Sequence, residues 1–444
     1  MGQKGSAPGE ILNDEHKPRE DSKEPSNRHE SSDDEDAGEV IEPPSDVKFA
    51  NKQRIREDQV QQDGIGEGKE LPDTLSLSFS HTKTRISPAD FKVLKLLGQG
   101  SFGKVYLVTH RADDCIYAMK VMRKDVLVKG DQVTHTVTER FVMSHLQHPN
   151  LVKLRFAFQT STRLYLVMDF ARGGELFYHL KQSGRFSEDR VRFYTAQIAL
   201  ALEYLHTHSV VYRDLKPENI LLDEHGNIQL TDFGLSKPYV SDKEGARTFC
   251  GTPEYIAPET LVNQSYGASV DWWSLGTLAF EMITGLPPFY NSNVKVMYWQ
   301  ILNSKVVFPD FVSPDARDLL KRLLRKNPER RMDHTTIRRH PFFRSINWDD
   351  LYNLTIPPPF KPTLHTLTDV RYFDPVFTKE TPGESFVPET ELRRIDRDTQ
   401  AAFEGFTFVD HSRLGNIREE VGSVPEALVE MDIVGSPIEH MGGY

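Results

Sequence analysis

A charged string near the middle of the chain carries residues that can act on a phosphoryl group. Residues 212–219 read YRDLKPEN, in which Asp214 can accept or orient a hydroxyl proton and Lys216 can neutralise a phosphoryl group. The side-chain oxygen of Asn219 can bind a metal ion, and Asp232, thirteen residues later in DFG, offers a second, anionic ligand. Hard oxygen ligands of this kind suit Mg²⁺, which bridges phosphate oxygens. The string therefore predicts chemistry on a metal-bound phosphate.

A glycine-rich string lies upstream, at residues 98–105 (GQGSFGKV). Alone it is weak evidence, because such strings occur in simple glycine turns and in dinucleotide-binding folds. The dinucleotide fold needs a helix directly after the glycines, whereas the next residues, KVYLV, alternate between polar and apolar like a strand. We therefore expect Gly98, Gly100 and Gly103 in a β-hairpin whose backbone amides lie over phosphates.

A lysine and a glutamate between these strings form a candidate ion pair. Lys120 lies in the apolar string AMKVM, seventeen residues after Gly103. A lone lysine is more often a surface residue, but behind a phosphate lid it is a candidate clamp for the α- and β-phosphates. A buried ammonium group needs a carboxylate, and Glu139 in a helical string is the candidate. His135 lies four residues earlier and therefore projects from the same helix face.

Composition divides the chain into four segments. Residues 1–89 hold 12 Lys/Arg and 20 Asp/Glu with few aromatic residues, which predicts a disordered acidic leader. Residues 91–343 carry the motifs above and are expected to form the catalytic domain. Residues 344–410 are polar but rich in phenylalanine, which predicts an extended tail that wraps the domain and is anchored by aromatic side chains. Residues 411–444 show no recognisable chemistry, and we expect a flexible extension.

Periodicity within the catalytic domain predicts an α+β fold. Apolar and polar residues alternate as in strands at 91–97, 104–108, 116–122 and 163–169. Helical spacing follows at 133–147, 188–207 and 269–284. Because strands dominate first and helices later, we expect a small sheet-rich lobe joined to a larger helical lobe.

The composition also excludes several classes of protein. The chain has 444 residues, 38% of them hydrophobic, which rules out wholesale disorder. Its formal net charge of −11 argues against a nucleic-acid partner. Two cysteines, Cys115 and Cys250, cannot build a disulfide framework, and we find neither a transmembrane-length apolar run nor a secretory signal. We therefore expect an intracellular protein that is soluble or at most lipid-anchored. We also expect it to be a monomer that is found in the cytoplasm and can enter the nucleus.

Together these motifs resemble those of eukaryotic protein kinases of the AGC group, over about residues 88–410. The matching strings are 98–105, 118–120, 212–219, 232–234, 257–259 (APE) and 271–276 (DWWSLG). Within the group, the sequence is most similar to the ribosomal protein S6 kinases and next to protein kinase B. Three strings support this placement: 163–177 (RLYLVMDFARGGELF), 221–237 (LLDEHGNIQLTDFGLSK) and 403–409 (FEGFTFV). The resemblance implies a bilobal serine/threonine protein kinase that uses ATP and Mg²⁺.

The resemblance also implies residue roles. The catalytic residues would be Asp214 as base, Lys216 as phosphate-stabilising lysine, Asn219 and Asp232 as Mg²⁺ ligands, and Lys120 with Glu139 as the ion pair of the active state. Besides the glycines and Lys120, the nucleotide pocket would comprise Val105, Ala118, Met168, Asp169, Ala171, Glu175 and Leu221. Met168 would be the gatekeeper, and the backbone of Asp169 and Ala171 would bind adenine. Glu259 and Arg331 should form a structural ion pair.

Three acidic residues, Glu175, Glu218 and Glu281, match the positions that select basic substrates in this group. Singly, each is more often a solvated surface carboxylate. Together they would form an acidic rim that binds arginine in bidentate fashion. The resemblance implies a preference for Arg at position −3 before the acceptor Ser or Thr, and at −5 or −2.

The segment before the APE string contains the expected activation-loop phosphosite, Thr248. A phosphate there adds nearly two negative charges and needs cationic partners, which the resemblance places at Arg213, Lys237 and His135. Because His135 shares a helix with the glutamate of the ion pair, it would link the phosphate to the active state. An exposed helical histidine is the alternative interpretation of His135.

The tail carries two further matches. Thr381, which precedes a proline, resembles the turn-motif phosphosite, and Thr407 in FEGFTF resembles that of the hydrophobic motif. The aromatic residues of that string should dock beside the Glu139 helix. The implied upstream enzymes are a phosphoinositide-dependent kinase for Thr248 and a TOR complex for Thr407, although the N-terminal region lacks the Phe-led docking motif that S6 kinases use.

The first residues, MGQKGS, match a myristoylation pattern at Gly2. One acyl chain binds membranes only weakly without a polybasic patch or a second lipid, and this region offers neither. We therefore expect at most weak membrane association, and only if Gly2 is myristoylated. Two alternatives to a protein kinase stay open, a kinase-shaped scaffold without turnover and a kinase for small molecules.

Overall fold

The computed structural model describes residues 86–100, 102–238, 252–380 and 397–410. Contacts divide the chain into two units, Met1–Val40 and Ile41–Tyr444, and every described residue belongs to the second. Among the helices of these ranges, none has the length and apolar character needed to cross a membrane. The predicted sites at Gly2, Thr248 and Thr381, the extension 411–444 and nearly all of the predicted leader lie outside the described residues.

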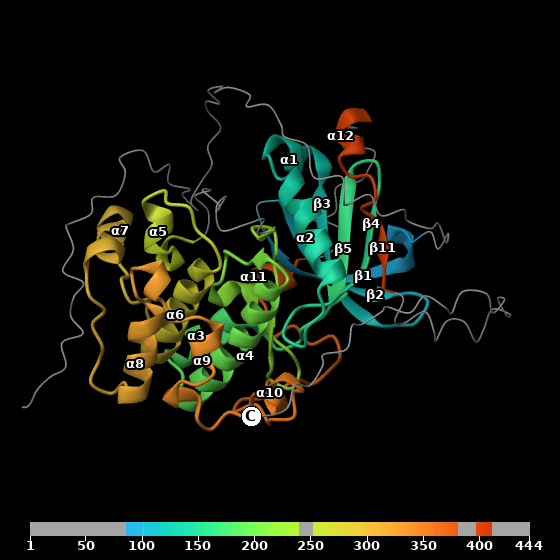
Figure 1. Ribbon diagram of the computed structural model, residues 1–444. Coiled ribbons are helices and arrows are strands. Elements are labelled where there is room, and N and C mark those ends of the chain that lie inside the picture. Colours follow the sequence, from blue (N-terminus) through green and yellow to red (C-terminus); the bar gives the residue numbers. More distant parts are fainter. Residues whose placement is uncertain (1–85, 101, 239–251, 381–396, 411–444) are drawn as a thin grey trace, which may run out of the picture. The chain divides into compact units, whose positions relative to one another are not determined.

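Six antiparallel strands form the sheet of the first lobe, in the order β1-β2-β3-β5-β4-β11 (Figure 1). They are β1 (Phe91–Gln99), β2 (Gly103–His110), β3 (Ile116–Arg123), β4 (Leu154–Gln159), β5 (Arg163–Asp169) and β11 (Phe408–Val409). Successive strand side chains point to opposite faces, and in β2 Tyr106 and Val108 pack in one hydrophobic cluster and Leu107 in another. Both faces of the sheet are therefore packed, and the phosphate-lid glycines lie where β1 turns into β2.

Two helices, α1 (Lys124–Lys129) and α2 (Val133–His145), follow β3. The buried residues of α2 recur at helical spacing, namely Thr136, Glu139, Arg140, Val142 and Met143. The helix therefore has one buried and one exposed face, and Glu139 lies on the buried face.

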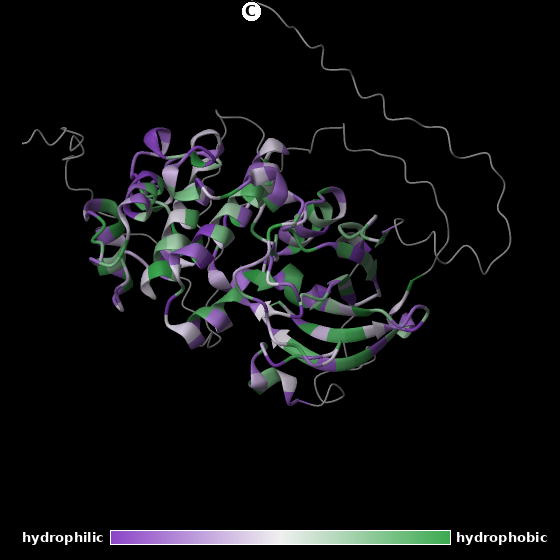
Figure 2. Cartoon of the chain, turned by 90° about the horizontal axis from the view of Figure 1, so that it is seen from below, coloured by the Kyte–Doolittle hydropathy of each residue, from purple (hydrophilic) through white to green (hydrophobic). Residues whose placement is uncertain are grey.

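The second lobe is built around two long helices, α4 (Glu188–Thr207) and α6 (Ser269–Thr284), whose hydrophobic residues dominate its interior (Figure 2). α4 begins after Ser187, whose side chain accepts a hydrogen bond from the backbone N–H of Arg190. α6 ends at Gly285, whose φ of 92° favours glycine. The other helices are α3 (Leu176–Ser183), α5 (Pro258–Leu261), α7 (Val294–Asn303), α8 (Pro314–Leu323), α9 (His334–Ile337) and α10 (Trp348–Tyr352).

Short elements at the edge of the helical lobe carry most of the motif residues. β6 (Gly174–Glu175), β8 (Ile220–Leu222) and β9 (Ile228–Leu230) form a three-stranded sheet, and β7 (Val210–Val211) pairs with β10 (Lys237–Pro238). Single turns of 3₁₀-helix lie at Pro88–Asp90, Pro217–Asn219, Pro253–Tyr255, Pro328–Arg330 and Pro341–Phe343. Each of these turns begins with proline, whose fixed φ suits the first helical position.

A buried ion pair joins two distant segments of the helical lobe. The guanidinium group of Arg331 donates to both carboxylate oxygens of Glu259, at 2.6 and 2.8 Å, and both side chains are about 1% exposed. The expected pairing of these two residues is therefore confirmed. Removing one partner of such a pair leaves a buried charge uncompensated. The pair therefore holds α5 against the segment between the turn Pro328–Arg330 and α9.

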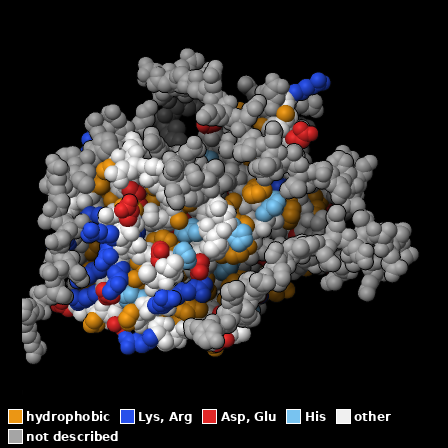
Figure 3. All heavy atoms as spheres, in the orientation of Figure 1, with side chains coloured by type: hydrophobic (Ala, Val, Ile, Leu, Met, Phe, Trp, Pro, Cys, Tyr) orange, Lys and Arg blue, Asp and Glu red, His pale blue; other side chains and the backbone are white. Residues whose placement is uncertain are grey.

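The charge of the helical lobe is uneven. Lys321, Arg322, Arg325 and Arg330 are exposed at the end of α8 and just after it, and Figure 3 shows Lys and Arg side chains gathered over this part of the lobe. Cations at a helix C-terminus interact favourably with the helix dipole. The negative net charge of the chain is thus compatible with a locally basic surface at α8.

The tail runs past both lobes. α11 (Pro375–Thr378) packs against β1, α12 (Arg397–Ala401) follows, and β11 pairs with β4. Phe403 and Phe406 are 0% and 3% exposed. The predicted anchoring of the tail through aromatic side chains is confirmed for its described residues.

The expected α+β fold with a sheet-rich and a helical lobe is confirmed. Two of the three predicted helices coincide with α4 and α6, and the third, 133–147, is two residues longer than α2. Each of the four predicted strands lies within β1, β2, β3 or β5. The pattern missed β4 and β11, which pair with each other.

Candidate active site

The glycine-rich string forms a β-hairpin, as expected, and no helix follows it. β1 and β2 pair with Gly98 opposite Val105, and the backbone N–H of Gly100 donates to the carbonyl of Gly103 at 2.9 Å. A Cβ atom at Gly103 would lie 2.6 Å from the carbonyl oxygen of Val121, so only glycine fits there. Gly98 and Gly100 face open space among the described residues, where no atom lies closer than 4.0 Å to an added Cβ. The hairpin therefore leaves room for a ligand to approach its backbone.

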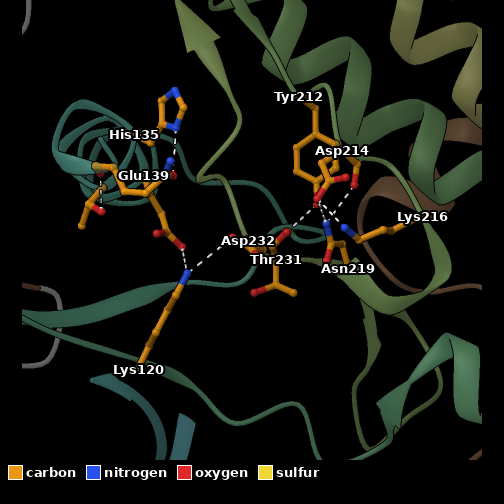
Figure 4. A network of polar contacts seen from close by, with 11 residues as sticks. Lys120, His135, Glu139, Tyr212, Asp214, Lys216, Asn219, Thr231 and Asp232 are labelled. Carbon is orange, nitrogen blue, oxygen red and sulfur yellow. Dashed lines mark hydrogen bonds and ion pairs between the residues drawn. The ribbon is translucent and has the colours of Figure 1, made fainter. Parts of the chain in front are cut away.

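Lys120 reaches two carboxylates (Figure 4). Its ammonium group donates to Glu139 on α2 at 2.6 Å and to Asp232 at 3.4 Å. Burial opposes the charge of Lys120, but the carboxylates of Asp232 and Glu139 outweigh it and raise the pKa of Lys120. Burial raises the pKa of Glu139, and the ammonium group limits that rise. The pair fixes α2 against the sheet and keeps a positive charge beside the lid.

The predicted base, phosphate lysine and first metal ligand lie together in one loop (Figure 4). Oδ2 of Asp214 accepts hydrogen bonds from Lys216 at 2.6 Å and from the amide of Asn219 at 2.8 Å. Within the described part of the chain, Oδ1 of Asp214 accepts no hydrogen bond. Burial raises the pKa of Asp214, whereas the charge of Lys120 lowers the pKa of Asp232. One carboxylate oxygen is thus free for an incoming hydroxyl.

The two predicted metal ligands are oxygen donors on either side of this loop. The side chain of Asp232 is half exposed, and Asn219 is held by hydrogen bonds from its amide to Asp214. Carboxylate and amide oxygens are ligands that Mg²⁺ accepts together with phosphate oxygens. The donor set and the open space under the lid glycines fit a Mg²⁺-nucleotide, which these two residues would hold.

One aspartate that sequence reasoning quoted without a role holds the catalytic loop. The buried carboxylate of Asp271 accepts the backbone N–H groups of Tyr212 and Arg213, each at 2.8 Å, and lies 2.8 Å from Nε2 of His206. Arg213 has a φ of 68°, a left-handed conformation that a non-glycine residue adopts only when its surroundings compensate. The signal in the sequence was an acidic residue at the start of an otherwise apolar helix.

We expect Asp271→Asn to loosen this loop, because an amide has one oxygen to offer the two backbone donors. Loss of one hydrogen bond to a buried carboxylate should lower the free energy of unfolding by about 2 kcal/mol and reduce kcat. Chemical denaturation and peptide turnover measure both effects. Asp310→Asn is a matched control, because the Asp310 side chain is fully exposed. An unchanged kcat in Asp271→Asn would contradict the positioning role.

The predicted nucleotide pocket lies between the lobes. Ala118 pairs with Met168 across β3 and β5, both belong to the main hydrophobic cluster, and Val105 and Leu221 pack against it. These four residues come from β2, β3, β5 and β8, so the two lobes contribute apolar walls to one place. The backbone N–H of Asp169 donates to the carbonyl oxygen of Lys153 at 3.0 Å.

The tail adds a residue to this region that sequence reasoning missed. Phe373 packs against the same hydrophobic cluster and stacks on Phe170, with 5.5 Å between ring centroids. Phe170 directly precedes Ala171, which is 4% exposed. The sequence indicated only that the tail is rich in phenylalanine. It did not indicate that Phe373 is the residue that reaches the junction of the lobes.

The three predicted substrate-selecting residues approach one another. Burial, then the charges of Glu218 and of Asp374 in the tail, raise the pKa of Glu175. The hydroxyl group of Tyr255 donates to Glu281. Burial, reinforced by the charges of Glu218 and Glu254, raises the pKa of Glu281 to about 7. Glu218 therefore acts electrostatically on both Glu175 and Glu281, and we call the three residues the acidic patch; Glu218 lies in the same loop as Asp214.

Two of the three residues predicted to bind a phosphate on Thr248, namely Arg213 and His135, have described side chains, and they influence each other electrostatically. Nε of Arg213 donates to the carbonyl of Leu235 at 2.5 Å. Burial, together with the positive charge of Arg213, lowers the pKa of His135 on α2. Lys237 belongs to β10, but its side chain, like Thr248, is outside the described residues. Arg213 and His135, which come from different lobes, thus lie within electrostatic reach of one another, and a phosphate between them would favour the charged form of His135.

The hydrophobic-motif string docks beside α2. Arg140 on α2 donates to the carbonyls of Phe406 and Thr407, at 3.2 and 3.1 Å. Buried Lys124 lies 5.2 Å from the ring centroid of Phe403 and donates to Gln159 and Gln400 at 2.7 and 2.6 Å. The side chain of Thr407 is exposed, so this predicted phosphosite is accessible. The tail therefore contacts the helix that carries Glu139.

Comparison with known proteins identifies the family. The family model of the protein kinase domain matches residues 91–343, and that of the protein kinase C terminal domain matches residues 365–408. A RAC family serine/threonine-protein kinase homolog from Dictyostelium discoideum is 51% identical over 332 residues, 74% of each chain. The RAC-beta serine/threonine-protein kinase of Rattus norvegicus is 45% identical over 75% of this chain and 71% of its own. The serine/threonine-protein kinase YPK2/YKR2 of Saccharomyces cerevisiae is 46% identical over 77% of this chain and 50% of its own.

These relatives leave the expected likeness to S6 kinases unconfirmed, since they are RAC and YPK kinases. The expected use of ATP and Mg²⁺ follows from the kinase domain. The chain belongs to the protein kinase family, as an AGC serine/threonine kinase with its C-terminal tail domain.

Proposed function

We propose that this kinase phosphorylates Ser or Thr in substrates with arginine at position −3, and that phosphorylation of its activation loop and tail switches it on. The observation that carries the substrate preference is the acidic patch of Glu175, Glu218 and Glu281 beside the catalytic loop. Three carboxylates within each other's electrostatic reach repel, and a guanidinium group relieves that repulsion while donating bidentate hydrogen bonds to a carboxylate.

In the proposed mechanism the chain positions the reactants and stabilises charge. Oδ1 of Asp214 accepts the proton of the substrate hydroxyl, while Oδ2 stays fixed by Lys216 and Asn219. Bound Mg²⁺, held by Asn219 and Asp232, would neutralise charge on the phosphates. Lys120 binds the phosphates from the other side, and its bond to Glu139 keeps it in place. Lys216 neutralises the phosphoryl group.

The proposed substrate preference predicts a dependence on pH. Glu281, with a pKa near 7, carries its charge above that pH and loses it below. The KM of a peptide with Arg at −3 should therefore rise by about threefold from pH 8 to pH 6, the size of one partly screened ion pair. A peptide with Ala at −3 and the Glu281→Gln variant should both show a smaller change. Equal pH profiles for the two peptides would contradict the assignment of Glu281.

The proposed switch uses the contacts of α2. A phosphate on Thr248 would be bound by Arg213, His135 and Lys237, and would tie α2 to the catalytic loop. Phosphate on Thr407, next to the carbonyls that Arg140 binds, would strengthen the docked tail. Thr381 would be the turn-motif phosphosite. We further propose a phosphoinositide-dependent kinase upstream of Thr248 and a TOR complex upstream of Thr407.

For the signalling role, the identities to RAC kinases support a place like that of protein kinase B, the alternative raised from the sequence, over one like the S6 kinases. We propose a cytoplasmic monomer that also enters the nucleus, and weak membrane association if Gly2 is myristoylated.

A positional-scanning peptide assay with Mg²⁺-ATP tests the proposal. The wild-type protein should select Arg at −3, and Glu281→Gln should weaken that selection while turnover of peptides with Ala at −3 stays the same. Glu224→Gln is the control, since Glu224 is paired with Arg172 outside the acidic patch. If the wild-type protein showed no residue preference at −3, or preferred acidic residues there, the proposed substrate class would be wrong.

A further inference from the structure

The outer face of α2 carries an apolar stripe that no described segment covers. Val137 and Phe141 are one helical turn apart and are 38% and 37% exposed. His145, one turn further, is exposed and stacks on Phe141, with ring centroids 4.2 Å apart. The rest of this face is Thr134, Thr138 and Ser144, so it carries no carboxylate. An apolar stripe on the helix that positions Glu139 is an unusual surface to leave open.

The tail of the chain borders this stripe. Arg140, the neighbour of Phe141 and three residues after Val137, binds the carbonyls of Phe406 and Thr407. The tail then forms β11, and Asp410 follows at the end of that strand. The carboxylate of Asp410 is paired with Arg155 at 2.8 Å and Lys153 at 3.1 Å. The chain is therefore held at β4, a strand that contacts α2, at the point where residues 411–444 begin.

The residues after Asp410 include an apolar, acidic segment that could bind to the apolar stripe on α2. Residues 419–444 contain six acidic residues and no Lys or Arg. Their apolar residues concentrate in 421–434, a string that reads VGSVPEALVEMDIV. An acidic segment meets no like charge on the outer face of α2, because that face has no carboxylate.

The linker between Asp410 and the apolar string is long enough to reach the stripe on α2. α2 has 13 residues and is therefore about 20 Å long. An extended chain advances about 3.3 Å per residue, so about six residues span the whole helix. The ten residues between Asp410 and Val421 can therefore bring the apolar string to either end of the stripe.

We propose that residues 421–434 bind along the outer face of α2, over Val137 and Phe141, and act as an intramolecular brace for the helix that carries Glu139. The expectation that 411–444 is only a flexible extension would then be incomplete. This brace is separate from the docking of Phe403 and Phe406, which are buried in the main hydrophobic cluster. It concerns binding within the chain and does not depend on the proposed substrate preference.

Photocrosslinking in the full chain tests the brace. With p-benzoylphenylalanine in place of Phe141, irradiation of dilute protein should give crosslinks to peptides from 421–434, identified by mass spectrometry. A mixture of ¹⁴N and ¹⁵N protein separates crosslinks within a chain from those between copies. The same probe at Val307, which is 80% exposed on the helical lobe, should give no crosslinks to that segment. Crosslinks between copies, crosslinks only to other segments, or none at all would overturn the proposal.

A second variant tests the role of the apolar residues. Leu428→Asp combined with Val429→Asp should reduce the yield of the Phe141-position crosslink at least about fivefold, the lower end of a typical intramolecular coupling. Ser423→Asp, in the same segment but outside the apolar string LVEMDIV, should leave the yield unchanged. A yield that survives the double substitution would overturn apolar docking as the cause.

Discussion

Asp214→Asn should lower kcat for peptide phosphorylation by about 10²–10⁴-fold, the usual contribution of general base catalysis. Oδ1 of Asp214 accepts no hydrogen bond within the described residues, so it is the atom available to the substrate hydroxyl. An asparagine can keep the bonds at the Oδ2 position through its oxygen, but its amide group would then face the hydroxyl as a donor. Turnover with saturating ATP and peptide measures the loss.

The same variant should still bind nucleotide, because Asp214 contacts neither the lid glycines nor Lys120. Titration with a fluorescent ATP analogue checks this, and thermal unfolding checks that the fold is intact. Asp189→Asn is a control, since Asp189 is 82% exposed at the start of α4. A kcat within tenfold of wild type would show that Asp214 is not the base.

Lys120→Met should reduce kcat/KM for ATP by at least about 10²-fold. The side chain of Glu139 is 4% exposed, and removing the ammonium group leaves its carboxylate buried without a partner. Breaking a buried pair in this way costs about 3–5 kcal/mol. The protein can avoid that cost only by protonating Glu139 or by moving α2 away from the sheet, and either response disables the phosphate clamp.

A double variant separates stability from catalysis. Lys120→Met with Glu139→Leu removes both charges, so the free energy of unfolding should recover toward wild type while ATP turnover stays lost. Lys92→Met, at an exposed position of β1, is the control for loss of a lysine. Recovery of turnover in the double variant would contradict the account, because the clamp would then be dispensable.

Local pattern was enough to predict elements with long, largely buried apolar runs. β5 coincides with its predicted range, and six of its seven residues are buried, while α4 and α6 coincide with long apolar strings. β4 was missed because only three of its six residues are buried and its apolar string is short. β11 has two residues and exists only through pairing with β4, about 250 residues earlier, which no local pattern can encode.

The residues of the candidate site also fall into two groups, those that sequence motifs identified and those whose role appeared only in the folded structure. The motif order identified Lys120, Asp214, Asn219 and Asp232, because their types and spacing are rarely found together in other folds. Asp271 gained its role only when folding brought the backbone N–H groups of the catalytic loop to its carboxylate. Contacts of this kind depend on long-range packing, and a sequence shows the donor and the acceptor but not their distance.

Arg155 is a further example. Its guanidinium group donates to both oxygens of Asp169, at 2.7 Å each, and to Asp410 at 2.8 Å. It therefore links the last residue of β5 to the tail. Arg155 lies in β4, which local periodicity did not identify. Its position in the sequence therefore gave no indication that it pairs with Asp169 and Asp410.

One measurement tests the central claim most directly, namely phosphorylation of a single peptide with Arg at −3 by full-length protein. Protein phosphorylated at Thr248 and Thr407 is compared with the same protein after phosphatase treatment, with Mg²⁺-ATP, and the phosphorylated residue of the peptide is identified by mass spectrometry. The account predicts strong turnover on Ser or Thr that falls sharply after dephosphorylation. No turnover from folded, doubly phosphorylated protein would contradict both the kinase mechanism and the switch proposed here.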